Sequence, residues 1–334
     1  MKKPFIVFLI MLLAIFPLAA CEGNSFYTSG DGELKIVTTV FVPFDIAREV
    51  TGGRASITLL QSNGADLHDY SPTASALTEL NEADIFICVG GVTDETWVDD
   101  AVAASENANL TVIKLTELCQ GLLAELEGHS HNEYCEQAHG HSHGHEHEHG
   151  HTANDGHGHV SDEHVWTSIR NVVSLTSAVA DACAEKDGAN AEFYKENAER
   201  YKEKLSELDA RYKQVTQASH NKTAVFADRF PFIYLTSDYG LCHYAAFSGC
   251  SSETDASFAT AVKLISAVRD NSLDCVFVTE NTDGKLASSV SDATGCKILE
   301  LNSLQSVTAK QIDGGLTYLG AMEQNLSQLQ KGLS

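Results

Sequence analysis

Basic residues are scarce in this sequence of 334 residues. Lys and Arg together number 22 against 46 Asp and Glu, so the formal net charge is −24 with His neutral. Proteins that bind nucleic acid need a basic surface for the phosphates, and docking on an anionic membrane surface needs one as well. The shortage of basic residues excludes nucleic acid as a partner and makes a cation the natural ligand.

Several familiar motifs of metal and catalytic sites are also missing from the predicted strands and helices. The 9 cysteines form no Cys-x-x-Cys pair, which excludes a zinc ribbon and a thioredoxin-like redox site. No predicted helix carries His-Glu-x-x-His, and no strand-to-helix turn carries Gly-x-Ser-x-Gly. A zinc hydrolase with Glu163 or Asp69 as general base is therefore only a remote alternative.

Only one long apolar run occurs, and it lies at the N-terminus. It follows Lys2 and Lys3, and ends in Leu18-Ala19-Ala20-Cys21. A basic start, a short apolar stretch and small residues before a Cys are typical of a bacterial lipoprotein signal. We expect a signal peptide over 1–20, a lipid on Cys21 and a Gly/Ser/Asn-rich tether over 21–33. The protein is then exported and anchored by lipid to the cell membrane, on its extracellular face or in the periplasm.

The rest of the chain alternates apolar strands with helices in two similar halves. Continuous apolar strands between helices predict parallel sheets that are covered on both faces. The fold class is α/β, with a first lobe over 34–189 and a second over 219–334, each built on a mostly parallel four-stranded sheet. Strands are predicted at 35–40, 56–60, 84–89, 110–115, 223–226, 244–247, 275–279 and 297–301. Helices are predicted at 43–50, 95–104, 230–239, 253–269, 284–294 and 318–333, with another beginning at 71–72.

A long amphipathic helix is predicted over 190–218, between the two lobes. Its apolar residues recur in alternating steps of four and three, the spacing of one helical face. The stripe is Tyr194, Ala198, Tyr201, Leu205, Leu208, Tyr212 and Val215. A helix of this length that packs on both lobes limits hinge motion between them.

Histidines are concentrated in one stretch, with 11 of the 15 lying between residues 129 and 159. The stretch has no apolar periodicity, which predicts a loop without a packed core. Alternating imidazoles can chelate Zn²⁺, Cu²⁺ or Ni²⁺, so we expect auxiliary metal capture; a pH-sensing or merely solvated tract is the alternative. The capturing residues are His139, His141, His143, His145, His147, His149 and His151.

A selective metal site needs ligands on rigid elements, and three residues stand at such positions. His68 follows a predicted strand and precedes a capped helix, at the end of a parallel sheet where ligands bind. His164 stands where the His-rich loop re-enters the fold, beside the apolar Val165 and Trp166. Glu280 ends a strand of the second half. A structural role is the alternative for each.

At these residues the chain resembles the zinc- and manganese-binding lipoproteins of metal ABC importers, the cluster A-I solute-binding proteins. The segments that carry the resemblance are 64–72, 162–166, 226–241 and 277–280. The resemblance implies two lobes joined by a rigid helix, with a metal ion in the cleft between them. His68 and His164 come from the first lobe and Glu280 from the second. An ABC permease and its ATPase are the implied partners.

The family's third histidine is replaced here by Ala227. Asp228 is the residue that most readily supplies an additional ligand, and Asp283, His243 or a water are alternatives. Two imidazoles and carboxylate oxygens suit Zn²⁺ or Mn²⁺, and the His-rich loop favours zinc. We therefore expect the zinc-binding component of an importer and not an enzyme; a manganese importer component and a surface zinc buffer or adhesin are the alternatives.

Overall fold

The computed structural model describes residues 26–65, 68, 70–95, 97–119, 121–125, 161–249 and 256–334. The predicted signal peptide, Cys21 and the whole His-rich loop over 129–159 lie outside these residues. In the described part of the chain, no helix has the length and apolar character of a membrane span.

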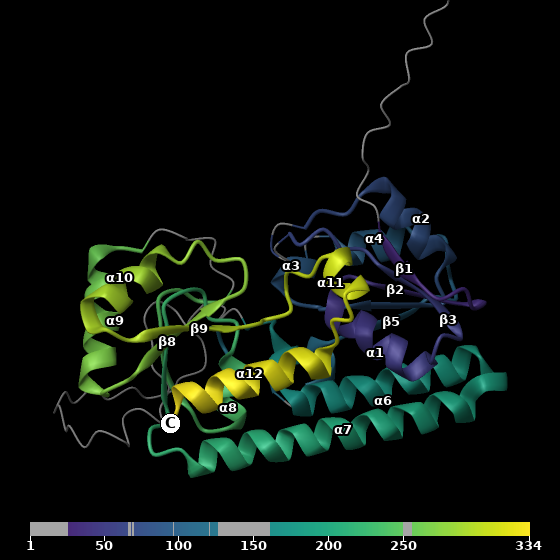
Figure 1. The fold of residues 1–334 in the computed structure, drawn as a ribbon. Coiled ribbons are helices and arrows are strands. Elements are labelled where there is room, and N and C mark those ends of the chain that lie inside the picture. The colour runs from purple at the N-terminus through teal and green to yellow at the C-terminus, as the bar shows by residue number, and fades with distance from the viewer. Residues whose placement is uncertain are drawn as a thin grey trace, which may run out of the picture.

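The first lobe contains a five-stranded sheet in the order β1-β3-β2-β4-β5 (Figure 1). Its strands are β1 (Tyr27–Ser29), β2 (Leu34–Thr38), β3 (Ala55–Leu59), β4 (Ile85–Cys88) and β5 (Thr111–Lys114). Four of them run parallel, as predicted, while β1 pairs antiparallel with β3 at the edge. The strand β1 falls inside the stretch that was predicted to be a tether, so part of that stretch belongs to the sheet.

Helices cover both faces of this sheet. They are α1 (Phe41–Thr51), α2 (Ala74–Glu82), α3 (Val92–Glu95), α4 (Val98–Ala104) and α6 (Ile169–Lys186), with the short 3₁₀ turns η2 (Thr116–Leu118) and η3 (Val165–Thr167). The helix predicted over 95–104 is two short helices that meet near Trp97. Helix α1 is apolar on most sides because it packs against the sheet, α6 and α7 at once.

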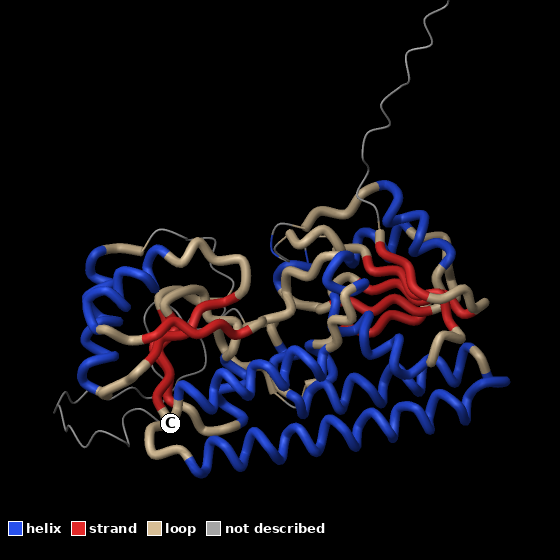
Figure 2. The backbone as a smooth tube through the Cα atoms, in the orientation of Figure 1, coloured by secondary structure: helices blue, strands red, loops and turns tan. Residues whose placement is uncertain are grey.

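The predicted linking helix is α7 (Ala191–Ala218), preceded by the turn η4 (Gly188–Asn190). It has 28 residues, which at 1.5 Å per residue span about 42 Å. Its stripe is buried from Tyr194 to Tyr212, as the spacing predicted. Figures 1 and 2 show α7 running beneath both lobes, with α6 beside it under the first.

The second lobe contains a four-stranded parallel sheet in the order β7-β6-β8-β9. Its strands are β6 (Thr223–Phe226), β7 (Cys242–Ala245), β8 (Cys275–Thr279) and β9 (Lys297–Leu301). Its helices are α8 (Ile233–Asp238), α9 (Phe258–Asp270) and α10 (Lys285–Thr294). Cys275 and Cys296, on neighbouring strand segments, are free, whereas Cys242 is in a disulfide.

After β9 the chain returns to the first lobe. There Ala309 N donates to Ser62 O (2.9 Å), and α11 (Ala309–Asp313) lies on the first sheet's side of the molecule. The last helix, α12 (Tyr318–Gly332), then runs back along α7 to the second lobe (Figure 1). The predicted second lobe over 219–334 therefore contains a segment that packs on the first lobe, and the chain passes between the lobes more than once.

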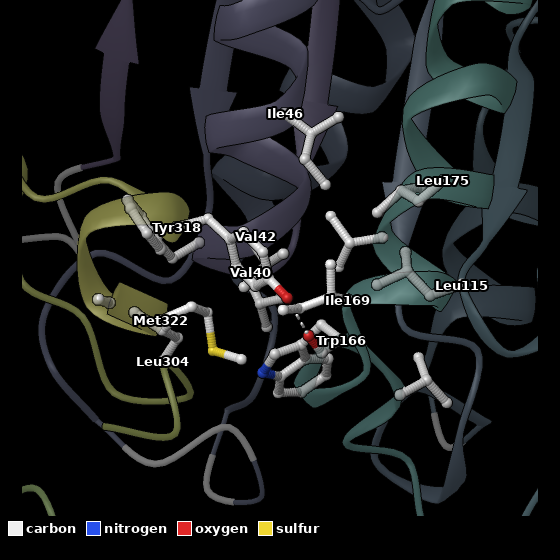
Figure 3. Packing of buried hydrophobic residues seen from close by; sticks show 14 of the residues in the cluster. Val40, Val42, Ile46, Leu115, Trp166, Ile169, Leu175, Leu304, Tyr318 and Met322 are labelled. Atoms are coloured by element: carbon white, nitrogen blue, oxygen red, sulfur yellow. Dashed lines mark hydrogen bonds between the residues drawn. The ribbon is translucent and has the colours of Figure 1, made fainter. Parts of the chain in front are cut away.

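The core continues from one lobe to the other around Trp166, which is 1% exposed. Figure 3 shows its indole between Leu115 and Ile169 of the first lobe and Leu304 and Met322 of the returning segment. The Trp166 carbonyl accepts a hydrogen bond from the Tyr318 hydroxyl (2.9 Å). The segment around His164 is therefore fixed by packing from both sides.

Leu205 tests the energetic role of the α7 stripe, because its side chain is fully buried. We expect Leu205→Ala to lower the free energy of unfolding by about 2–5 kcal/mol, through lost apolar burial and the cavity that remains. Urea unfolding in the presence of a chelator measures it. The exposed neighbour Lys204→Ala is the control and should change stability by less than about 0.5 kcal/mol. Equal effects of the two variants would show that the stripe contributes no special packing.

Asp45 tests the junction between α1 and α12. Its buried carboxylate accepts from Tyr318 N (2.7 Å) and from Arg48 (2.5 Å). Burial nevertheless raises the pKa of Asp45 to about 6, although the bonds from Tyr318 and Arg48 lower it. A folded-state pKa above the unfolded value means that protonation favours folding. This contribution is complete below about pH 4 and is lost as the pH rises through about 6.

Relative to Asp45→Asn, which does not titrate, the wild-type protein should lose about 2–3 kcal/mol of unfolding free energy between pH 4 and pH 7.5. Urea unfolding of both proteins at several pH values, with chelator present, measures the difference. A stability difference that stays constant with pH would contradict the raised pKa.

Candidate metal centre

The first lobe brings His68 and His164 together. His68 lies beyond the carboxyl end of β3, and His164 lies immediately before η3. Their ring centroids are 5.4 Å apart, with the ring planes inclined at 67°. The side chain of His68 is 19% exposed and that of His164 is fully buried. Two residues that are far apart in the sequence thus form an imidazole pair beyond the carboxyl end of β3.

The orientation of His68 is fixed through Nδ1. This atom lies 2.9 Å from Thr93 Oγ1 and 3.0 Å from Glu163 Oε1. A ring held by a carboxylate at one nitrogen presents the other nitrogen to a metal, and such partners orient histidine ligands in many metal sites. The other ring nitrogen of His68, Nε2, is buried.

Glu163 is a buried carboxylate with several donors. Thr93 donates to it from both its backbone N (3.1 Å) and its hydroxyl. Burial raises the pKa of Glu163, but the hydrogen bonds from His68 and Thr93 outweigh this effect and hold the pKa below its ordinary value. Gly91 allows the close approach, since a Cβ there would lie 2.3 Å from Glu163 Oε2. From the sequence, Glu163 is predicted only as the general base of a remote hydrolase alternative, because its contact with His68 leaves no local signal.

His164 is held in the same manner by Asp162. Its Nδ1 lies 3.0 Å from Asp162 Oδ1, and its backbone N donates to the same oxygen (2.8 Å). Gly249 of the second lobe packs against this pair, because a Cβ on Gly249 would lie 3.1 Å from His164 Cε1. With Nδ1 at Asp162, the other ring nitrogen, Nε2, faces Gln305.

The second lobe meets His164 through Gln305, which the sequence analysis did not consider. Gln305 Oε1 lies 2.9 Å from His164 Nε2, and the Gln305 residue is 4% exposed. Gln305 follows the carboxyl end of β9, the same kind of position that singled out Glu280. The preference of ligands for the carboxyl ends of parallel strands predicts this location. A glutamine, however, is not a typical zinc ligand and does not stand out in the sequence.

Glu280 lies directly after β8, as expected, and its carboxylate faces Ser303. Its two oxygens accept from Ser303 N (2.7 Å) and Ser303 Oγ (2.6 Å). Burial raises the pKa of Glu280, while the bonds from Ser303 partly offset the rise. Among the described residues, no group of three or more His, Cys, Asp or Glu is arranged to hold a metal ion. The structure thus pairs the two histidines but does not gather Glu280 with them.

Asp228 lies at the end of β6, beside Glu280's strand. Its Oδ2 accepts from Thr279 N (3.1 Å) and Thr279 Oγ1 (2.6 Å), so it links the ends of β6 and β8. Its Oδ1 accepts from Arg229 N (2.9 Å). Asp228 therefore lies at the strand ends of the second lobe, where its carboxylate is hydrogen-bonded within that lobe.

The two remaining alternatives lie in other surroundings. Asp283 has a side chain that is 59% exposed and pairs with Lys285 (2.6 Å), whose hydrogen bond lowers the pKa of Asp283. His243 is buried on β7, where its ring stacks on Phe230 with centroids 4.2 Å apart. These surroundings are a surface ion pair and an aromatic core contact.

The His-rich loop leaves and re-enters the fold beside His164. Ala124 and Ser161 form an antiparallel bridge, and Asp162 N donates to Leu123 O (2.9 Å). Tyr234 of the second lobe donates from its hydroxyl to Asp162 O (2.7 Å). The two ends of the loop are therefore joined next to the histidine pair. The capturing residues His139–His151 themselves lie outside the described residues.

Comparison with known proteins identifies the family. The model of the ZnuA family, described as zinc-uptake complex component A, periplasmic, matches residues 36–332. The zinc-binding lipoprotein AdcA of Streptococcus pneumoniae R6 is 30% identical over 332 residues, 98% of this chain and 61% of that protein. This chain therefore spans about three fifths of AdcA. The zinc uptake protein ZnuA of Bacillus subtilis is 26% identical over 330 residues, 97% of each chain.

Solved structures agree with this result. The Zn(II)-bound ZnuA-like domain of S. pneumoniae AdcA is 28% identical with a TM-score of 0.68, over 90% of this chain and 99% of that one. The lipoprotein YcdH of B. subtilis has a TM-score of 0.71 at 22% identity, which shows the shared fold. The expected resemblance to metal importer binding proteins is confirmed, and this chain belongs to the ZnuA family of zinc-uptake component A proteins.

Proposed function

We propose that this protein is the extracytoplasmic zinc-binding component of an ABC metal importer, which captures Zn²⁺ between its lobes and delivers it to the permease and its ATPase. The observation that carries the proposal is the pair His68 and His164. Each ring is held at Nδ1 by a buried carboxylate, and the rings lie 5.4 Å apart. Two oriented imidazoles at the junction of two lobes are a typical start of a selective zinc site.

The proposed ligands are His68, His164 and Glu280, with Asp228 as an additional ligand. Both oxygens of Glu280 accept from Ser303, and Glu280 has to move toward the histidines to reach the ion. Asp228 accepts from Thr279 in a similar way. The exposed Asp283 has the weakest support, because its carboxylate is paired with Lys285 at the surface.

Zinc is the proposed cargo, and Mn²⁺ is the alternative that the donor set also permits. Imidazole suits Zn²⁺, whereas carboxylate oxygen suits Mn²⁺ as well. AdcA of S. pneumoniae and ZnuA of B. subtilis are named as zinc-binding and zinc uptake proteins. Export and lipid anchoring at Cys21 complete the proposal. They rest on the N-terminal sequence and would hold the protein beside a membrane permease.

Substitution of either paired histidine tests the site. We expect His68→Ala and His164→Ala each to weaken the tightest zinc binding by more than about 100-fold, because each removes a direct ligand. Competition with a chelator of known affinity measures it on the full chain. His220→Ala, at an exposed histidine, is the control and should bind as tightly as the wild type. Retention of tight binding in both histidine variants would refute the site.

The His-rich loop is proposed to raise the local zinc concentration, since its ends are joined beside His164. Replacement by Ser of the seven histidines between positions 139 and 151 should lower the number of zinc ions bound and the rate of capture. One tight site should remain, because a loop of this composition has little preorganisation. Calorimetric titration and stopped-flow mixing with zinc measure both quantities. Loss of the tight site itself would show that the loop supplies selective ligands.

A further inference from the structure

One short segment of the second lobe contacts two of the proposed ligands at once. Ser303 donates to both oxygens of Glu280, and Gln305 lies on Nε2 of His164 at 2.9 Å. The segment is also attached to the first lobe, because Trp166 Nε1 donates to Ser303 O (2.8 Å). We call residues Ser303, Leu304 and Gln305 the clasp. This inference rests on the proposed function and concerns what the ion has to displace.

The backbone at the centre of the clasp is strained. Leu304 has φ at +62°, in the left-handed region that branched, bulky residues rarely adopt. Its side chain is 1% exposed and packs in the core beside Trp166 and Met322 (Figure 3). Strained residues of this kind persist where surrounding contacts hold them, and they are common at ligand clamps and switch regions. The contacts at Ser303 and Gln305 are such restraints on either side.

The clasp and a zinc ion compete for the same atoms. Asp162 holds Nδ1 of His164, so a metal has to bind Nε2. A zinc–nitrogen bond is about 2.0–2.1 Å long, and the ion would take the place now filled by the Gln305 amide. The Gln305 amide can turn either its oxygen or its nitrogen to the ring. In both orientations it fills the place that the ion would take at Nε2. The carboxylate of Glu280 is likewise engaged by Ser303.

We propose that the clasp is a lobe-bridging element that zinc displaces, with Gln305 as the positioning residue that sets zinc affinity by competing for His164. Release of Gln305 frees one end of the segment, and withdrawal of Glu280 from Ser303 frees the other. Because Ser303 and Gln305 are only two residues apart, binding of zinc at His164 favours separation of Glu280 from Ser303, and the reverse also holds. The strain at Leu304 is relieved in the same step.

Gln305→Met tests the proposal, because it keeps the length of the side chain but removes its polar atoms. Chelator competition should give zinc binding about 3- to 10-fold tighter than in the wild-type full chain. This factor corresponds to the free energy of the one hydrogen bond between Gln305 and His164 that zinc no longer has to break. The melting temperature should fall more in chelator than in saturating zinc. Gln330→Met, on an exposed position of α12, is the matched control and should match the wild type in both measurements.

The possible outcomes separate the roles. Unchanged affinity with equal destabilisation of both forms would mean a purely structural role and would overturn the clasp. Weaker zinc binding would make Gln305 a ligand and would also overturn it. A wild-type chain without tight zinc binding would overturn the proposed function itself, and the clasp with it.

A second measurement does not need the Gln305 variant to fold. Only two tryptophans occur in the chain, so Trp97→Phe leaves Trp166, which is bonded to Ser303, as the reporter. Zinc should change its emission with saturation at the tight site. His68→Ala in the same background, in which the His-rich loop still binds zinc, should abolish the change. Tight zinc binding without any change in Trp166 emission would overturn the clasp.

Discussion

A hydrogen bond at one imidazole nitrogen fixes the direction in which the other can bind a metal, and the turn from Asp162 to Trp166 provides this constraint. Asp162 holds His164, and Glu163 reaches across to His68. Trp166 then packs into the core that joins the lobes. Each residue of the turn thus has a separate task, and displacement of the turn would disorient both rings at once. The location of the site follows from the packing of Trp166 as much as from the histidines.

This arrangement buries two carboxylates next to each other, which is unfavourable unless each is hydrogen-bonded. Glu163 is hydrogen-bonded to Thr93 and His68, and Asp162 is hydrogen-bonded to the backbone N and the ring of His164. The first lobe therefore carries negative charge at the site before any ligand of the second lobe is counted. Together with the net charge of −24, it provides a field that attracts a divalent cation and opposes anions.

The sequence predicted the parts of the fold whose signal is local. Strands β6, β8 and β9 begin and end at the predicted residues. Strand β1 was missed because a three-residue edge strand in a Gly/Ser/Asn-rich stretch has no periodicity to detect. The helix predicted over 95–104 begins only at Val98, because the buried Trp97 precedes it outside helical geometry.

For the candidate site, only the positions of the two paired histidines were predictable from the sequence. His68 and His164 stand at a strand end and before a helical turn, and such positions can be located from the pattern of elements. The surroundings of His243 and Asp283 could not be located in this way. Whether a strand residue faces the core and whether a loop residue faces solvent are decided by tertiary packing. The contributions of Glu163 and Gln305 depend on contacts between residues far apart in the chain, for which one sequence contains no signal.

The connections between the lobes limit how the site can respond to an ion. Helix α7 runs continuously beneath both lobes, and α12 packs along it in the same direction, from the first lobe to the second. The segment before α11 adds a further connection, fixed at Ser62 on one side and at Trp166 on the other. Opening the lobes by a hinge would break helical hydrogen bonds and a continuous core together, whereas rearranging a few loop residues breaks only a small number of contacts. Rearrangement of the loops at the sheet ends therefore costs less free energy than a hinge motion, so we expect the response to a metal ion to be local.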